Sequence, residues 1–144
     1  GEDSEHPDVL DFCSKNQLSF VAWSPLARGL LTDRYLDLRH VGPGDRLFDE
    51  GTLERDRTEE DVAKLMALAE LAREWDLELS QLVLAYALSL PGMGPMIPAA
   101  ASEAQVESNA AAGKLVLEDE QRKRIRMVLA PKPAQSPEAE GVAG

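Results

Sequence analysis

Few side chains in this sequence could serve as a nucleophile, acid or base. They are one cysteine, two histidines and two tyrosines: Cys13, His6, His40, Tyr35 and Tyr86. Cys13 falls on the apolar side of a short expected helix, which favours a buried thiol. Tyr86 lies in an apolar helical segment and is interpreted as a packing residue, whereas a solvated or lid role is expected for Tyr35 and His40. No two of these residues form a nucleophile–base pattern, so the sequence predicts no catalytic residue and no metal ligand.

The elements that would position a site follow an alternation of strand and helix signals, which indicates an α/β protein. A buried strand is expected at residues 18–23, closed by Ser24-Pro25, and a second, parallel strand at residues 94–98. Helices are expected at residues 7–16, 58–75, 80–90, 102–112 and 118–129. Capping-box patterns begin the helices near Thr58 and Ser102, and Gly113 provides a stop. The segment 80–90 is apolar on nearly all sides, so it should be sandwiched between other elements.

Two segments lack such periodicity. Residues 25–57 contain four glycines and many charges, and a loop of this length is usually functional or disordered. Residues 131–144 contain three prolines and almost no large apolar side chain, so we expect a disordered tail after a domain at residues 1–130. Because residue 1 is not methionine, we interpret the chain as a fragment or a processed product.

The overall charge and hydropathy narrow the classes of partner. The 144 residues carry 15 Lys and Arg against 26 Asp and Glu, a formal net charge of −11, which disfavours nucleic-acid binding. The longest apolar run, residues 82–88, is far shorter than the ~20 residues of a membrane span. The single cysteine fits a reducing compartment, and the N-terminus shows no secretory pattern, so a cytoplasmic location is expected.

Three stretches in order along the chain resemble the C-terminal half of the aldo-keto reductase family. They are VAWSPLARGLLTDRY at residues 21–35, ELSQLVLAYALSLPGMGPMIPAA at 78–100 and ASEAQVESNAAA at 101–112. The resemblance covers roughly residues 8–129. It implies the C-terminal portion of a (β/α)₈ TIM barrel, about strands 7 and 8 with their flanking helices, from a fold of about 250 residues. The family's catalytic aspartate, tyrosine, lysine and histidine come from the first half of the barrel, and no residue here matches them.

The resemblance also implies that this portion binds the cofactor. It places Ser24, Leu26 and Gly29 at the cofactor pyrophosphate, where a hydroxyl, backbone N–H groups and a glycine suit phosphate oxygens. A basic position of the same pattern matches Arg34, and the resemblance implies a phosphate-facing arginine farther along the loop at Arg46. The adenosine end is implied for Ala101, Ser102, Gln105 and Asn109. Structural alternatives remain open: a strand-ending turn at Ser24-Pro25, a solvated charge at Arg34 and a helix start at Ser102 and Gln105.

Three departures from the family pattern bear on the choice of cofactor. Ala99 replaces the usual glycine after Ile-Pro, Ser108 replaces the usual glutamate before the asparagine, and residues 94–112 contain no Lys or Arg. A 2′-phosphate is normally matched by cationic donors. The resemblance implies NADP as the cofactor, with NAD as the alternative. Because this segment lacks cations, Arg34 or Arg46 would have to supply the charge for NADP.

The function implied by the resemblance is that of an NAD(P)H-dependent aldo/keto reductase, which reduces carbonyls by hydride transfer. The expected partners are a nicotinamide dinucleotide and, in the complete enzyme, a carbonyl substrate. Alternatives are a non-catalytic remnant or partner-binding module of the same fold, and a truncated product without activity. Two strands cannot close a barrel, so self-association or a complementing N-terminal half is also expected.

Overall fold

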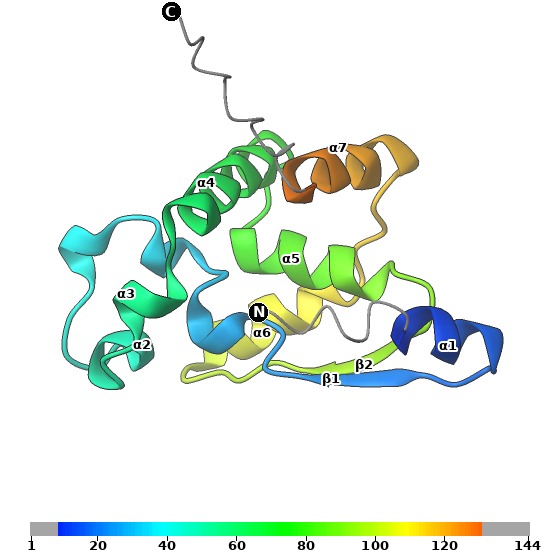
Figure 1. Cartoon of the computed structure of the whole chain (residues 1–144), viewed down its shortest axis with the longest axis horizontal. Coiled ribbons are helices and arrows are strands. Elements are labelled where there is room, and N and C mark those ends of the chain that lie inside the picture. Colours follow the sequence, from blue (N-terminus) through cyan, green and yellow to red (C-terminus); the bar gives the residue numbers. More distant parts are fainter. Residues whose placement is uncertain (1–8, 131–144) are drawn as a thin grey trace, which may run out of the picture.

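The computed structural model describes residues 9–130 of the chain. It shows an α/β arrangement in which helices α4, α5 and α7 lie on one side of a small sheet (Figure 1). The tail expected at residues 131–144 lies outside the described residues, as do residues 1–8. None of the helices in the described range is long and apolar enough to span a membrane.

The sheet consists of two parallel strands, β1 (Phe20–Trp23) and β2 (Met93–Ile97). Phe20 pairs with Met93 and Trp23 pairs with Ile97, with an irregularity in register between them. Helices α4 and α5 lie between the two strands in the chain, as expected for a crossover that joins parallel strands. The prediction of a second, parallel strand is therefore confirmed.

The prediction that β1 is buried is wrong. Trp23 is 79% exposed and Val21 is 52% exposed, and Ile97 on β2 is 60% exposed. In the part of the chain that the structure describes, the sheet has only these two strands, so each keeps an unpaired edge. Their apolar residues match a sheet covered on both faces, and much of that cover is absent from residues 9–130.

The core lies among three helices, α4 (Glu59–Glu74), α5 (Leu79–Leu88) and α7 (Asp119–Leu129). Leu79 and Leu82 of α5 are fully buried and Ile125 of α7 is 1% exposed, which confirms that α5 is sandwiched. The capping box at Thr58 is also confirmed, because its Oγ1 accepts from the backbone N–H of Asp61 at 3.2 Å. Met66, expected on the buried stripe of α4, is instead 49% exposed.

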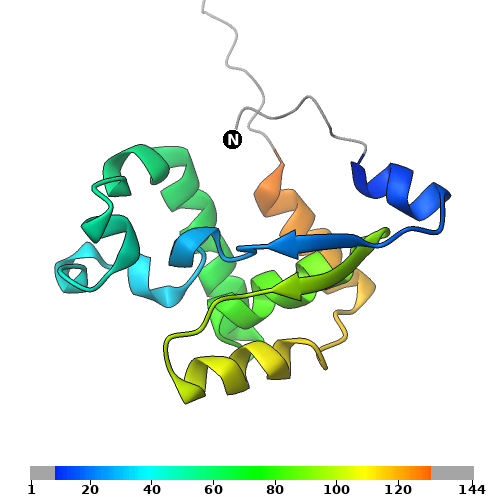
Figure 2. The same cartoon turned by 90° about the horizontal axis from the view of Figure 1, so that it is seen from below.

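The helix α1 (Val9–Lys15) lies against the N-terminal ends of the strands (Figure 2). Cys13 is buried there, as predicted, whereas Phe12 is exposed. The turn before β2 approaches α1 so closely that a Cβ on Gly92, whose φ is +81°, would lie 2.1 Å from the carbonyl oxygen of Leu10. Only glycine fits this contact without a shift of the backbone.

The segment 25–57 folds into five short helical turns. They are η1 (Ala27–Gly29), η2 (Asp33–Tyr35), η3 (Leu38–His40), α2 (Arg46–Asp49) and α3 (Leu53–Asp56). A solvated or lid role for Tyr35 is wrong, because this side chain is 3% exposed and its Oη accepts from the backbone N–H of Leu47 at 3.1 Å. His40 is exposed, in agreement with a solvated position. The apolar residues of this segment extend the core that α4 and α5 form.

Candidate functional site

An open cleft of about 350 Å³ lies where the two strands end at their carboxyl termini. The segment after β1 forms one wall, and the segment after β2 with α6 (Glu103–Ala112) forms the other. Eight of the nine predicted cofactor residues line it: Ser24, Leu26, Gly29, Arg34, Arg46, Ala101, Gln105 and Asn109. Ser102 is the ninth; it is the N-cap of α6 and does not line the cleft. The fold therefore gathers residues that lie more than 80 positions apart in the chain.

The wall after β1 is a backbone turn in an uncommon conformation. Ser24, Ala27 and Arg28 have φ of 50°, 47° and 59°, and Gly29 has φ of 96°. Each non-glycine residue in this region costs on the order of 1 kcal/mol, and such residues cluster at ligand-binding loops. A Cβ on Gly29 would lie 3.3 Å from Tyr35, so glycine also allows the turn to pack on the buried ring.

The opposite wall is held by the start of α6. The Oγ of Ser102 accepts from the backbone N–H of Gln105 at 3.3 Å, which confirms the predicted helix start. The side-chain oxygen of Gln105 accepts from the N–H of Ala101 at 2.6 Å, and Asn109 contacts the carbonyl oxygen of Ala99 at 3.5 Å. Gln105 thus has a structural task, whereas the long contact of Asn109 leaves its amide available.

The two predicted basic residues already have carboxylate partners. Arg34 donates to both oxygens of Asp45, and Arg46 donates from Nε to Glu50 at 2.8 Å. The hydrogen bonds from Arg34 and from the N–H of Gly42 lower the pKa of Asp45. The carboxylate of Asp45 in turn raises the pKa of Arg34. Both arginine side chains remain about half exposed, so they stay within reach of a ligand.

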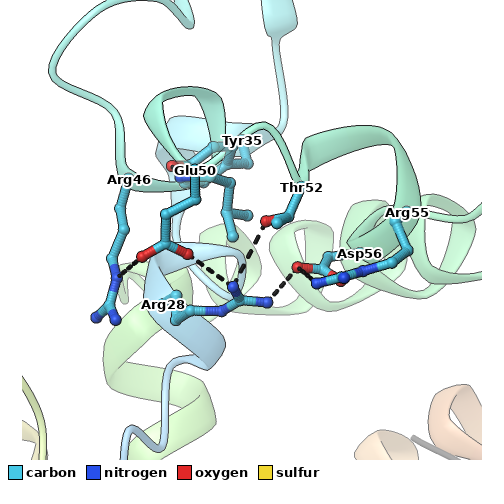
Figure 3. Close-up of polar contacts among 8 residues, drawn as sticks. Arg28, Tyr35, Arg46, Glu50, Thr52, Arg55 and Asp56 are labelled. Carbon is cyan, nitrogen blue, oxygen red and sulfur yellow. Dashed lines mark hydrogen bonds and ion pairs between the residues drawn. The ribbon is translucent and has the colours of Figure 1, made fainter.

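A third arginine, Arg28, binds three residues of the α2–α3 region (Figure 3). It donates to Glu50 at 2.7 Å, to Asp56 and, at 3.5 Å, to Thr52. Glu50 thereby joins Arg28 to Arg46. The hydrogen bonds from both arginines lower the pKa of Glu50, and the bond from Arg46 has the larger effect. The pKa of Asp56 falls to about 2, chiefly because Arg55 donates to it. No local pattern singles out Arg28, because its partners lie 22 to 28 residues away in the chain.

A carboxylate was missed on the α6 side of the cleft as well. Glu78, just before α5, lines the cleft, and its Oε2 accepts from the Oγ of Ser108 at 2.6 Å and of Ser80 at 3.4 Å. The replacement of a usual glutamate by Ser108 was the one sequence signal at this place. It did not identify Glu78, which lies 30 residues earlier in the chain.

The residues that line the cleft provide binding groups and no acid–base pair. They include no Lys and no His, and the hydroxyl of Tyr35 is bonded to Leu47. Within residues 9–130, no three His, Cys, Asp or Glu side chains gather to hold a metal ion. The arrangement can offer hydroxyl, amide and guanidinium donors to an extended anionic ligand.

A parallel strand pair with a polar cleft at its carboxyl ends is typical of α/β proteins. These proteins bind their ligands at the carboxyl ends of the strands. The model of the Aldo/keto reductase family matches residues 2–130. The chain belongs to this family, and its expected fold class, the C-terminal portion of the barrel, is confirmed.

Relatives and solved structures agree with this assignment. The chain is 36% identical over 123 residues to "Uncharacterized oxidoreductase Rv2298" of Mycobacterium tuberculosis, covering 81% of this chain and 36% of that protein. It is 27% identical over 106 residues to a "Probable voltage-gated potassium channel subunit beta" of Arabidopsis thaliana, covering 71% of this chain and 32% of that one. The holo form of aldo-keto reductase AKR11C1 from Bacillus halodurans matches with 27% identity and a TM-score of 0.59, over 88% of this chain and 38% of that structure. The chain thus spans about a third of the length of each of these proteins.

Proposed function

We propose that the cleft binds the pyrophosphate and adenosine portion of a nicotinamide dinucleotide. The chain would then form the cofactor-binding part of an NAD(P)H-dependent aldo/keto reductase, which reduces a carbonyl substrate. The observation that carries this proposal is the gathering of eight residues, singled out by their match to the family pattern, around one cleft at the carboxyl ends of two parallel strands. This edge is where ligands bind in such folds.

The residues on the β1 side would bind the pyrophosphate. The hydroxyl of Ser24 is a donor for a phosphate oxygen, and the turn at Leu26 and Gly29 lets the backbone approach the ligand closely. Arg34 and Arg46 would add charge-assisted hydrogen bonds from the edge of the cleft. A strained turn of this kind is typical of a loop that holds a ligand.

The residues on the α6 side would bind the adenosine. Asn109 would present an amide donor and acceptor from the helix face, beside Ala101 and Gln105. When bound, the nicotinamide supplies the hydride for the carbonyl carbon. The proton for the carbonyl oxygen would come from outside the lining of this cleft, which contains no Lys, no His and no exposed tyrosine hydroxyl.

Two further expectations remain predictions: a cytoplasmic location and self-association of the chain.

A second candidate function is that of a non-catalytic, partner-binding protein of the same fold. It is supported by the similarity to proteins named as probable potassium channel β subunits and by the lack of an acid–base pair in the cleft. Dinucleotide binding is compatible with both candidates. A carbonyl reductase assay on the protein with its complete barrel separates them.

Dinucleotide binding is tested by removing one donor from each wall of the cleft. Ser24→Ala and Asn109→Ala should each weaken NADPH or NADH binding by about 1 kcal/mol, and up to about 3 kcal/mol where a phosphate is the acceptor. Ser14→Ala, on the exposed side of α1 at the other end of the strands, is the matched control and should leave affinity unchanged. Titration calorimetry measures all three. Unchanged dissociation constants for both cleft variants would contradict the proposal.

A further inference from the structure

The charges around the cleft are unevenly distributed. All three arginines that line it, Arg28, Arg34 and Arg46, belong to the segment after β1. The α6 wall contributes no cation to the lining and faces the carboxylate of Glu78. The β1 side of the lining therefore contains arginines together with the carboxylate of Asp45, whereas the α6 side contains a carboxylate, Glu78, and no cation.

We propose that Glu78 determines dinucleotide specificity by disfavouring a 2′-phosphate, so that this chain prefers NAD over NADP. This inference rests on the proposed function, which assigns the adenosine end to the α6 wall. It goes further by naming the residue that selects between the two dinucleotides and the direction of that selection.

The position of Glu78 is set by contacts across two helices. Its Oε2 accepts from Ser108 of α6 at 2.6 Å, next to Asn109 on the same wall, while its own backbone N–H donates to Gln81 at 3.1 Å. No Lys, Arg or His within residues 9–130 lies within 4 Å of this carboxylate, as an ion pair would require. Glu78 is exposed, and its carboxylate lines the cleft beside the adenosine end of the proposed site.

The chemistry of the two dinucleotides differs only at the adenosine 2′ position. A carboxylate accepts a hydrogen bond from a ribose 2′-hydroxyl, which is how an acidic residue selects NAD in dinucleotide-binding folds. A 2′-phosphate has no proton to donate when fully ionised, and its charge is repelled by the carboxylate. Residues 94–112 contain no Lys or Arg that could offset this repulsion.

The arginines on the other wall do not compensate. Arg34 is bound bidentately by Asp45. Arg46 is bound by Glu50, and Arg28 is bound by both Glu50 and Asp56 (Figure 3). A 2′-phosphate would have to compete with these carboxylates for any of the three cations. In the proposed site, the pyrophosphate, which both dinucleotides share, would be the group bound beside these arginines, so they would not distinguish NAD from NADP.

The test compares NAD⁺ and NADP⁺ binding to the wild-type chain and to Glu78→Gln, which keeps the shape and removes the charge. Wild type should bind NAD⁺ more tightly, and Glu78→Gln should raise the affinity for NADP⁺ relative to NAD⁺ by about five- to tenfold. Glu70→Gln removes an equivalent charge from the exposed face of α4 and should leave the ratio unchanged. Circular dichroism checks that each variant is folded.

A second measurement needs no variant. Because the repulsion at an exposed carboxylate is screened by salt, the wild-type preference for NAD⁺ should narrow as the ionic strength rises from about 0.05 to about 0.5 M. A wild-type chain that binds NADP⁺ as tightly as NAD⁺, or an unchanged ratio in folded Glu78→Gln, would overturn the role of Glu78. Binding of neither dinucleotide would instead overturn the proposed function.

Discussion

Two parallel hydrogen bonds join the guanidinium of Arg34 to the carboxylate of Asp45, from Nε to Oδ1 at 2.6 Å and from Nη2 to Oδ2 at 2.7 Å. Asp45 also accepts from the backbone N–H of Gly42 at 2.8 Å, so one side chain ties η2 to the start of α2. With the contacts of Arg28, this bridge closes the segment 25–57 into an ordered wall of the cleft.

The stability of this wall should fall in acid. Hydrogen bonds from arginines hold the pKa values of Asp45, Glu50 and Asp56 below their ordinary values, to about 2 for Asp56. A lowered folded-state pKa adds stability above the unfolded value, and this is lost as pH falls through the folded one. We therefore expect the melting temperature to drop between about pH 4 and pH 2. Asp56→Asn should make the melting temperature less dependent on pH. A wild-type melting temperature that does not change over this pH range would contradict the prediction.

Gly92→Ala should destabilise the chain by more than about 1 kcal/mol. The positive φ alone costs an alanine about 1 kcal/mol, and the added Cβ would also clash with the backbone of α1. Gly51→Ala is the matched control, because Gly51 has φ of +64° and no atom within 4 Å of its added Cβ. Urea unfolding measures both free energies. Equal losses in the two variants would show that the contact with Leu10 carries no cost.

The isolated chain should have no carbonyl reductase activity. The cleft lining lacks Lys and His, and Tyr35 is buried, so the lining offers no tyrosine–lysine pair that could protonate a carbonyl oxygen. Oxidation of NADPH or NADH with several aldehydes and ketones, followed by absorbance, should stay at the blank rate. Turnover clearly above the blank would show that this prediction is wrong.

The exposed sheet should make the isolated chain bind a hydrophobic dye such as ANS or elute larger than a monomer. Trp23 and Val21 of β1 and Ile97 of β2 are apolar residues of the sheet, and each is more than half exposed. Trp23→Ser should reduce dye binding or association, whereas Val116→Ser, at an exposed loop position before α7, should have a smaller effect. A monomeric elution volume with a sharp two-state melt and no dye binding would contradict the prediction.

The sequence by itself determined where the main elements begin and end. Thr58 and Ser102 cap their helices as predicted, Gly113 follows the end of α6, and the parallel strand at β2 lies where the pattern placed it. The helix starts and the helix stop depend on interactions within about four residues, which a local pattern contains. The pairing of β2 with β1 joins residues more than 70 positions apart, and the alternation of strands and helices along the chain indicated it. The match to the family pattern likewise selected eight of the residues that line one cleft.

The tertiary structure alone decided burial and charge pairing. Tyr35 is buried and Trp23 is exposed, against the local patterns of both, because burial depends on which distant elements cover a side chain. The pairing of Glu78 with Ser108 spans 30 residues and that of Arg28 with Glu50 spans 22. No local pattern encodes such contacts, since they form only after the chain has folded back on itself, and they decide which charges the cleft presents to a ligand.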